Sequence, residues 1–190
     1  MGNRQGVYET KFTFNFITHR THHMLSFLNF SSTIVRPGLV RAFSKGPAGY
    51  IVGKLAATTG SSIDLTHTYS QKEITGFAEL SGDTNPIHVD PKFAANTPFG
   101  KTIVHGIYSS SLFSRMLGST VHGSVYVGQT LRFLKPIFTD NTVKAKIEVV
   151  QVEKRKRGSL LTCSTTVHIL QEDSIPVLAV VGEAQVLVPF

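Results

Sequence analysis

The fold can be worked out from residues 103–118, which read IVHGIYSSSLFSRMLG. This stretch predicts a helix that begins near His105 and ends at Gly118, because a glycine after the last apolar turn is a common helix stop. Small residues occupy Gly106 and positions 109–111. They leave room for another backbone, so we expect other elements to wrap closely around this helix.

Four long segments after the helix are rich in Val, Ile and Thr, a composition typical of β-strands. They span residues 125–134, 142–152, 159–170 and 177–188. Turn-forming residues separate neighbouring segments, and strands joined by short turns pair as an antiparallel meander. The small-residue helix is the natural element for such a sheet to curl around.

A strand and a helix precede this part of the chain. Residues 63–69 alternate apolar and polar side chains, as a half-buried strand does. Ser70 and Glu73 have the spacing of a capping box, so a helix should start there and stop at Gly82. Residues 83–100 are interrupted by prolines and read as a loop with one short turn. We therefore predict an α+β domain with an antiparallel five-stranded sheet wrapped around a central helix.

The loop contains an acid and a base in fixed spacing. Residues 82–91 read GDTNPIHVDP, which places Asp83 and His88 between stiffening prolines. A rigid loop can aim a carboxylate and an imidazole at one point, as general acid–base catalysis requires. The alternative is structural: Asp83 only caps local backbone and His88 is a satisfied core histidine. Asn85 is expected to fix the loop.

The start of the predicted helix offers a second chemical feature. Backbone N–H groups at a helix start have no partner within the helix, and glycine lets a ligand approach closely. The N–H of Gly106 is therefore a candidate donor to an oxygen that gains negative charge. His105 is expected to be a structural contact at the helix start and not a second base.

The surrounding residues carry a family resemblance. Residues 83–90, 93–94, 99–100 and 103–106 together resemble the MaoC-like, (R)-specific enoyl-thioester hydratases, and similarity extends over roughly residues 63–188. The resemblance implies the hotdog fold, a long antiparallel sheet around one helix. Within the family, the N-terminal leader and the single-domain length are most similar to the mitochondrial dehydratases.

The resemblance also implies roles for individual residues. Asp83 and His88 would form the catalytic pair, and the N–H of Gly106 would polarise the thioester carbonyl. Ser114 matches a supporting serine of related hydratases and would orient the carboxylate, while Asn85 would support the loop. No metal and no cofactor are expected. The substrate would be a thioester of acyl-carrier protein or coenzyme A, and the chain would form a homodimer.

The N-terminal segment is predicted to be a mitochondrial transit peptide. Residues 1–63 hold seven Lys/Arg and a single acid, and an Arg-rich, Ser-rich, acid-poor leader is typical of organelle import. We expect residues 1–43 to be removed before Ser44, residues 44–62 to form a linker and residues 63–190 to form the dehydratase domain of the matrix. Met24 is a possible alternative start.

Composition excludes several other classes. The formal charge of +7 resides almost wholly in the leader, so the nearly neutral remainder argues against a nucleic-acid binder. No apolar stretch reaches the length of a membrane span. The single cysteine, Cys163, excludes an internal disulfide framework and predicts a small filler in a strand.

The sequence is compatible with other roles for the basic turn and with other activities. The basic turn at residues 154–157 is either a solvated hairpin tip or a contact for an acidic partner or coenzyme A phosphates. An (R)-specific enoyl-CoA hydratase is the main alternative activity. A hotdog thioesterase is another, and a noncatalytic acyl-binding or RNA-associated protein represents a different class.

Overall fold

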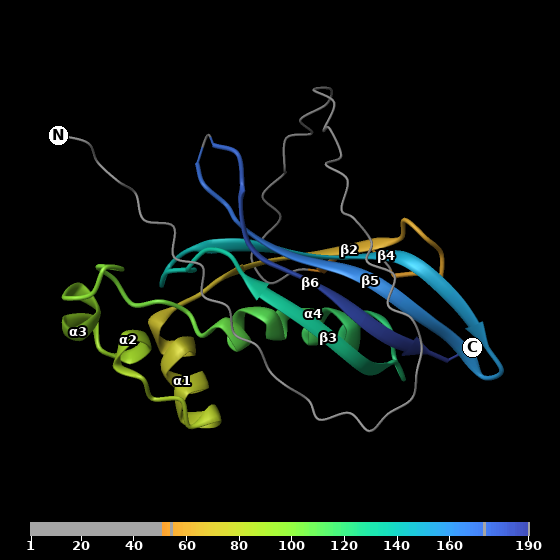
Figure 1. Ribbon diagram of the computed structural model, residues 1–190, viewed down its shortest axis with the longest axis horizontal. Coiled ribbons are helices and arrows are strands. Elements are labelled where there is room, and N and C mark those ends of the chain that lie inside the picture. Colours follow the sequence, from red (N-terminus) through yellow and green to blue (C-terminus); the bar gives the residue numbers. More distant parts are fainter. Residues whose placement is uncertain (1–50, 54, 173, 190) are drawn as a thin grey trace, which may run out of the picture. The chain divides into compact units, whose positions relative to one another are not determined.

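A long antiparallel sheet curls along one central helix (Figure 1). The computed structural model describes residues 51–53, 55–172 and 174–189, so the predicted transit peptide, its cleavage site and Met24 lie outside the described residues. The central helix is α4, Gly106–Thr120. The strands are β1 (Ile51–Val52), β2 (Ser62–Thr68), β3 (Val125–Phe133), β4 (Thr142–Arg155), β5 (Gly158–Ile169) and β6 (Val177–Val188).

The strands follow the order β1-β2-β4-β5-β6-β3. The antiparallel sheet and the five long strands are confirmed, but the chain-order meander is wrong for one strand. β3 pairs with β6 at the sheet edge and not with β4, its successor in sequence. Residues 134–141 therefore cross from one edge of the sheet towards the middle, which places β3 beside the end of the chain.

A sixth strand extends the opposite edge. β1 pairs with β2, with Ile51 opposite Leu65, and it falls in the segment predicted to be a linker. Leu55, in the same segment, is 6% exposed and belongs to the hydrophobic core. The folded unit therefore includes part of that segment.

The helix α1, Gln71–Ser81, begins and ends as the sequence predicts. The side chain of Ser70 accepts from the Glu73 N–H, and the Glu73 carboxylate accepts from the Ser70 N–H at 2.8 Å. Gly82 closes the helix with a φ of 78°, a left-handed conformation that glycine adopts without strain. This ending turns the chain directly into the Asp83 loop.

The predicted loop after α1 contains two short helices, α2 (Pro86–Val89) and α3 (Pro91–Ala95). Each has a proline in its first turn, where the missing N–H costs nothing. The side chain of Asn85 caps α2 and that of Asp90 caps α3. The predicted short turn corresponds to α3, whereas α2 has no counterpart in the prediction, because a helix this short has no apolar period.

The helix α4 is wrapped on one side only. Leu112, Phe113 and Met116 are buried against the sheet, whereas Ser111 and Ser114 are exposed. The expected wrapping of other elements around this helix is confirmed on its buried side, where the small residue Ser109 is 1% exposed. Cys163 is fully buried in β5, as predicted for a small core filler.

Candidate active site

Three titratable side chains meet at the start of α4. Asp83, His88 and His105 each offer an oxygen or nitrogen atom, and these atoms all lie within 4.8 Å of one another. Asp83 is in the loop after α1, His88 is in α2 and His105 is the N-cap of α4. The structure thus brings together the predicted acid and base, and it adds a second imidazole.

The His88 ring has a defined tautomer. It is 9% exposed, and its Nδ1 lies 2.8 Å from the carbonyl oxygen of Ile103. Since a carbonyl can only accept, Nδ1 must carry the hydrogen, which leaves the Nε2 lone pair free to take a proton. Burial lowers the pKa of His88, and His105 lowers it further, against opposing effects of Ile103 and Asp83. The ring is therefore a neutral base near pH 7.

The Asp83 loop is shaped by side-chain hydrogen bonds. Asp83 Oδ1 accepts from the Asn85 N–H at 3.3 Å, and Asn85 Oδ1 accepts from the Ile87 N–H at 3.2 Å. The Asp83 N–H donates to Ser81 Oγ at 3.2 Å. Asp83 is exposed, so its second carboxylate oxygen can face a substrate. Asn85 lies where it supports the loop and the start of α2.

His105 is almost fully buried and touches both members of the pair. Its Nε2 lies 2.9 Å from the backbone carbonyl oxygen of Asp83. Its ring stacks on that of His88 with centroids 3.8 Å apart and planes inclined by 26°. The contact at the helix start agrees with the expectation from the sequence, whereas the stack depends on the turn of α2, which no local pattern predicts.

Gly106 is the first residue of α4. Helix geometry leaves its N–H without a partner in the helix. The ring of Phe133, at the end of β3, covers the position where a side chain would stand: a Cβ built on Gly106 would lie 2.9 Å from Phe133 Cε1. The sequence indicates the glycine, but its aromatic neighbour is 27 positions away and no local pattern predicts the contact.

Ser114 lies on the exposed side of α4. It follows Gly106 by eight residues, about 12 Å along a helix. Among the described residues, no hydrogen bond joins Ser114 to Asp83. Its supporting role stays a prediction.

A continuous row of rings connects the site to the interior. It runs from His88 through His105, Phe77, Tyr108 and Tyr69 to His67, with centroid separations between 3.8 and 5.2 Å. Phe77 comes from α1, so the row joins α1, β2 and α4. Burial raises the pKa of Tyr69 well above its usual range, which keeps that hydroxyl neutral. The end of the row that holds His88 and His105 thus packs against further aromatic rings.

The three site residues are of metal-ligating types. Stacked imidazoles, however, direct their in-plane lone pairs side by side, whereas a metal ion needs lone pairs that converge on one point. Proton transfer, which needs only one accessible nitrogen and one carboxylate, suits this geometry better.

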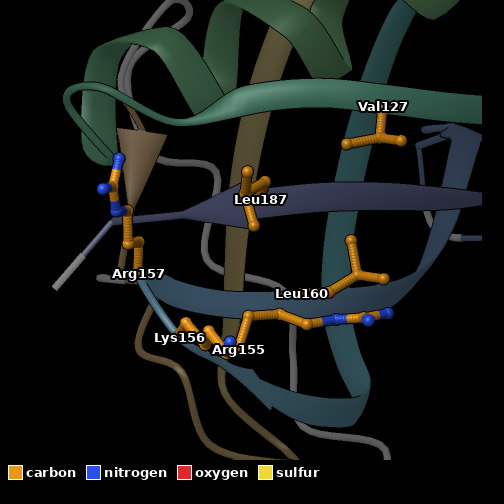
Figure 2. Close-up of a pocket in the computed structure, with 6 residues that line it drawn as sticks. All are labelled: Val127, Arg155, Lys156, Arg157, Leu160 and Leu187. Atoms are coloured by element: carbon orange, nitrogen blue, oxygen red, sulfur yellow. The ribbon is translucent and has the colours of Figure 1, made fainter.

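A pocket of about 520 Å³ lies at the other end of the sheet, at the β4–β5 turn (Figure 2). Figure 2 shows Val127, Leu160 and Leu187 facing it, with the guanidinium groups of Arg155 and Arg157 at opposite ends. Leu160 and Leu187 are partners across β5 and β6. Their neighbours Leu161 and Val186 point into the core, so the pocket opens on the outer face of the sheet, away from α4.

Comparison with known proteins agrees with this fold. Residues 54–170 match the family described as MaoC like domain. The chain is 40% identical to an (R)-specific enoyl-CoA hydratase of Aeromonas caviae over 132 residues, covering 68% of this chain and 94% of that protein. It is 27% identical to a mitochondrial 3-hydroxyacyl-[acyl-carrier-protein] dehydratase of Arabidopsis thaliana over 161 residues, covering 84% and 92%.

A solved structure agrees as well. The (R)-hydratase from A. caviae involved in PHA biosynthesis superimposes with a TM-score of 0.64 at 38% identity, over 70% of this chain and 97% of that one. The chain belongs to the MaoC-like family, and its fold is the hotdog fold of these hydratases. It is a hydro-lyase of that family. No helix in the described part of the chain has the length and apolar character of a membrane span.

Proposed function

We propose that the protein reversibly dehydrates (3R)-hydroxyacyl thioesters to trans-2-enoyl thioesters, as a dehydratase of mitochondrial fatty-acid synthesis. The observation that carries the chemistry is the approach of the Asp83 carboxylate and the His88 imidazole to within 4.8 Å, beside the start of α4. The relatives named above are hydratases and dehydratases of 3-hydroxyacyl or enoyl thioesters.

In the proposed dehydration the Asp83–His88 pair first accepts a proton and then returns one. The Asp83–His88 pair removes the C2 proton, and the electron pair of that bond moves towards the thioester carbonyl oxygen. The N–H of Gly106 donates to this oxygen as its negative charge grows. The enolate electrons then form the C2–C3 double bond, the C3–O bond breaks, and the departing hydroxyl takes a proton from the pair and leaves as water.

In the hydration direction the pair holds one water and delivers it to one face of the double bond. The two groups differ in environment, which favours different roles for them. Asp83 is exposed, whereas His88 is buried and keeps Nε2 unprotonated. Such a difference lets one group act as acid while the other acts as base.

The carrier of the acyl group is the finer part of the proposal. Mitochondrial acyl-carrier-protein dehydratases of A. thaliana and Solanum lycopersicum match at 27% and 29% identity, which supports acyl-carrier protein. The alternative is an (R)-specific enoyl-CoA hydratase, because relatives at 40% and 41% identity are named for coenzyme A substrates. The chain resembles mitochondrial hydroxyacyl-thioester dehydratase type 2, and its basic leader supports the first choice.

We also propose that the protein acts as a homodimer joined through β3. This strand is an edge of the sheet and carries exposed apolar side chains, with Val125 and Val127 each 55% exposed. A free, apolar strand edge is prone to pair with other chains, and a twofold copy covers it. Because Phe133 of the same strand lies against Gly106, the partner would stand beside the site.

Two experiments test the proposal. Purified protein is offered (3R)-hydroxyacyl groups on acyl-carrier protein and on coenzyme A, and enoyl formation is followed at matched concentrations. A higher kcat/KM with carrier protein supports the dehydratase, and a higher value with coenzyme A favours the alternative. Sequencing the N-terminus of protein from isolated mitochondria tests import: loss of the residues before Ser44 is expected, and an intact Met1 would refute it.

A further inference from the structure

We propose that His105 is a positioning residue. It holds the loop of Asp83 and the imidazole of His88 in fixed positions relative to the start of α4. The inference rests on the proposed function, in which Asp83 and His88 exchange protons with the substrate. No role beyond a structural contact follows for His105 from the sequence.

The position of His105 is fixed by the core. It is the N-cap of α4 with a φ of −56° and a ψ of 131°, and it is 2% exposed. The helix that it begins is anchored by Phe113 and Met116, both fully buried. The side chain does not cap its own helix, so its polar atoms are available to neighbouring elements.

One of these atoms connects the core to the Asp83 loop. Since the Asp83 carbonyl oxygen can only accept, His105 Nε2 carries the hydrogen and donates it across 2.9 Å. Asp83 itself is exposed. A buried donor thus restrains the backbone of an exposed carboxylate, and the reach of that carboxylate depends on this backbone.

The flat face of the same ring restrains His88. The 3.8 Å stack limits tilting of the His88 ring out of its plane, and the hydrogen bond from His88 Nδ1 to Ile103 limits rotation within the plane. Ile103 and His105 are two positions apart in the segment that leads into α4. This segment therefore sets the direction in which His88 Nε2 points, relative to the Gly106 N–H.

His105 also acts on the charge of the pair. With Nε2 protonated, its Nδ1 is a buried acceptor without a hydrogen-bond partner. Burial is the main cause that lowers the pKa of His88; the His105 ring covers it and adds to the lowering, whereas Ile103 and Asp83 raise it. Phe77 and Tyr108, the other rings along this part of the row, are uncharged. Loss of His105 should therefore raise the pKa of His88 and move the acid limb of the pH–rate profile to higher pH.

Two substitutions separate the two contacts. His105→Phe keeps a ring face for His88 but removes the donor to Asp83, and His105→Gln keeps an amide donor but removes the ring. We expect each to lower kcat by about 10- to 100-fold, the range for small misplacements of catalytic groups, with KM changed by less than about threefold. The acid limb should move upward in the Phe variant.

The control is His168→Gln, which removes a half-buried imidazole from β5 on the outer face of the sheet. It should leave kcat and the pH profile unchanged. Folded His105 variants with kcat within about twofold of the parent and an unmoved acid limb would overturn the proposal. A loss of kcat without any movement of the acid limb of the pH–rate profile would make His105 a packing residue, which would also overturn the proposal.

A measurement on the unmodified protein guards against variants that do not fold. Nitrogen NMR of the imidazoles should show His88 protonated at Nδ1 and His105 protonated at Nε2 near neutral pH, and the opposite tautomer at His105 would refute the inference. Asp83→Asn tests the underlying function separately. If that variant retains full activity, the catalytic pair itself fails, whereas inactivity of Asp83→Asn beside fully active His105 variants sinks only the positioning role.

Discussion

The ring of Phe133 stands where a side chain of residue 106 would have to be, since a Cβ built on Gly106 falls 2.9 Å from Phe133 Cε1. Glycine at this position thus lets the half-exposed ring of Phe133 lie against the helix start, in addition to any need for access to its N–H. The contact links the helix start to β3, the strand that we propose to join the two subunits.

Gly106→Ala should destabilise the protein by overpacking. A cost of about 1–3 kcal/mol corresponds to a fall in Tm of roughly 3–10 °C for a domain of this size. Gly118→Ala is the matched control in the same helix, because nothing lies within 4 Å of a Cβ there. It should raise the Tm slightly through helix propensity. Adding Phe133→Leu to Gly106→Ala should restore the Tm; failure to do so would show that the ring is not the obstacle.

Asp83→Asn and His88→Ala should each lower the rate of hydration by about 100-fold or more, the usual contribution of an acid–base group. Circular dichroism and thermal melting of the same samples check that the fold persists. Retention of more than about a tenth of the parent rate in both variants would contradict the assignment of the pair.

Stability should fall as the pH drops below about 6.5. Burial lowers the pKa of His67, His88 and His168 in the folded protein. Between these lowered values and the ordinary one, the unfolded chain binds more protons, so acid favours unfolding. Urea midpoints at about pH 7.5 and pH 5 measure the effect. His168→Gln should weaken this dependence.

Neutralising the basic turn should leave catalysis intact, because the β4–β5 turn lies at the end of the sheet away from α1–α3 (Figure 1). Its pocket opens on the outer face of the sheet. For Lys156→Gln with Arg157→Gln, we expect KM for a coenzyme A thioester to change by less than about twofold, as for a solvated face. The same acyl group on pantetheine, which has no phosphate, is the reference substrate. A rise of about tenfold with coenzyme A alone would instead assign the turn to phosphate binding.

Dilution to the monomer should lower the specific activity together with the molecular mass. Sedimentation at micromolar concentration is expected to give twice the chain mass, and Val125→Lys, which places a charge on the exposed edge of β3, should shift it to the monomer with lower kcat/KM. A fully active monomer would disprove both the assembly and its part in the site.

Local patterns in the sequence predicted most of the fold. The capping box at Ser70, the stop at Gly82 and the strand periods depend on neighbouring residues only, and the structure has them within a few residues. The place of β3 beside β6 was missed because it depends on a crossover whose path is set by the curl of the whole sheet. The short strand β1 has too few residues to show a period.

The site, like the fold, has parts that local sequence predicts and parts that it does not. Asp83 and His88 were identifiable because their loop carries both residues and the prolines that stiffen it. The stack of His105 on His88 and the cover of Phe133 over Gly106 join segments that are distant in sequence. No local pattern marks them.

The row of rings also gives the protein an optical property. The chain contains no tryptophan, so tyrosines dominate its near-ultraviolet emission. Tyr69 and Tyr108 lie in the row that ends at His88, whereas Tyr126 lies in the edge strand β3. Substrate binding at the proposed site and the proposed pairing through β3 are therefore expected to change the intrinsic tyrosine fluorescence without a label, and Tyr126→Phe removes the contribution of the edge strand.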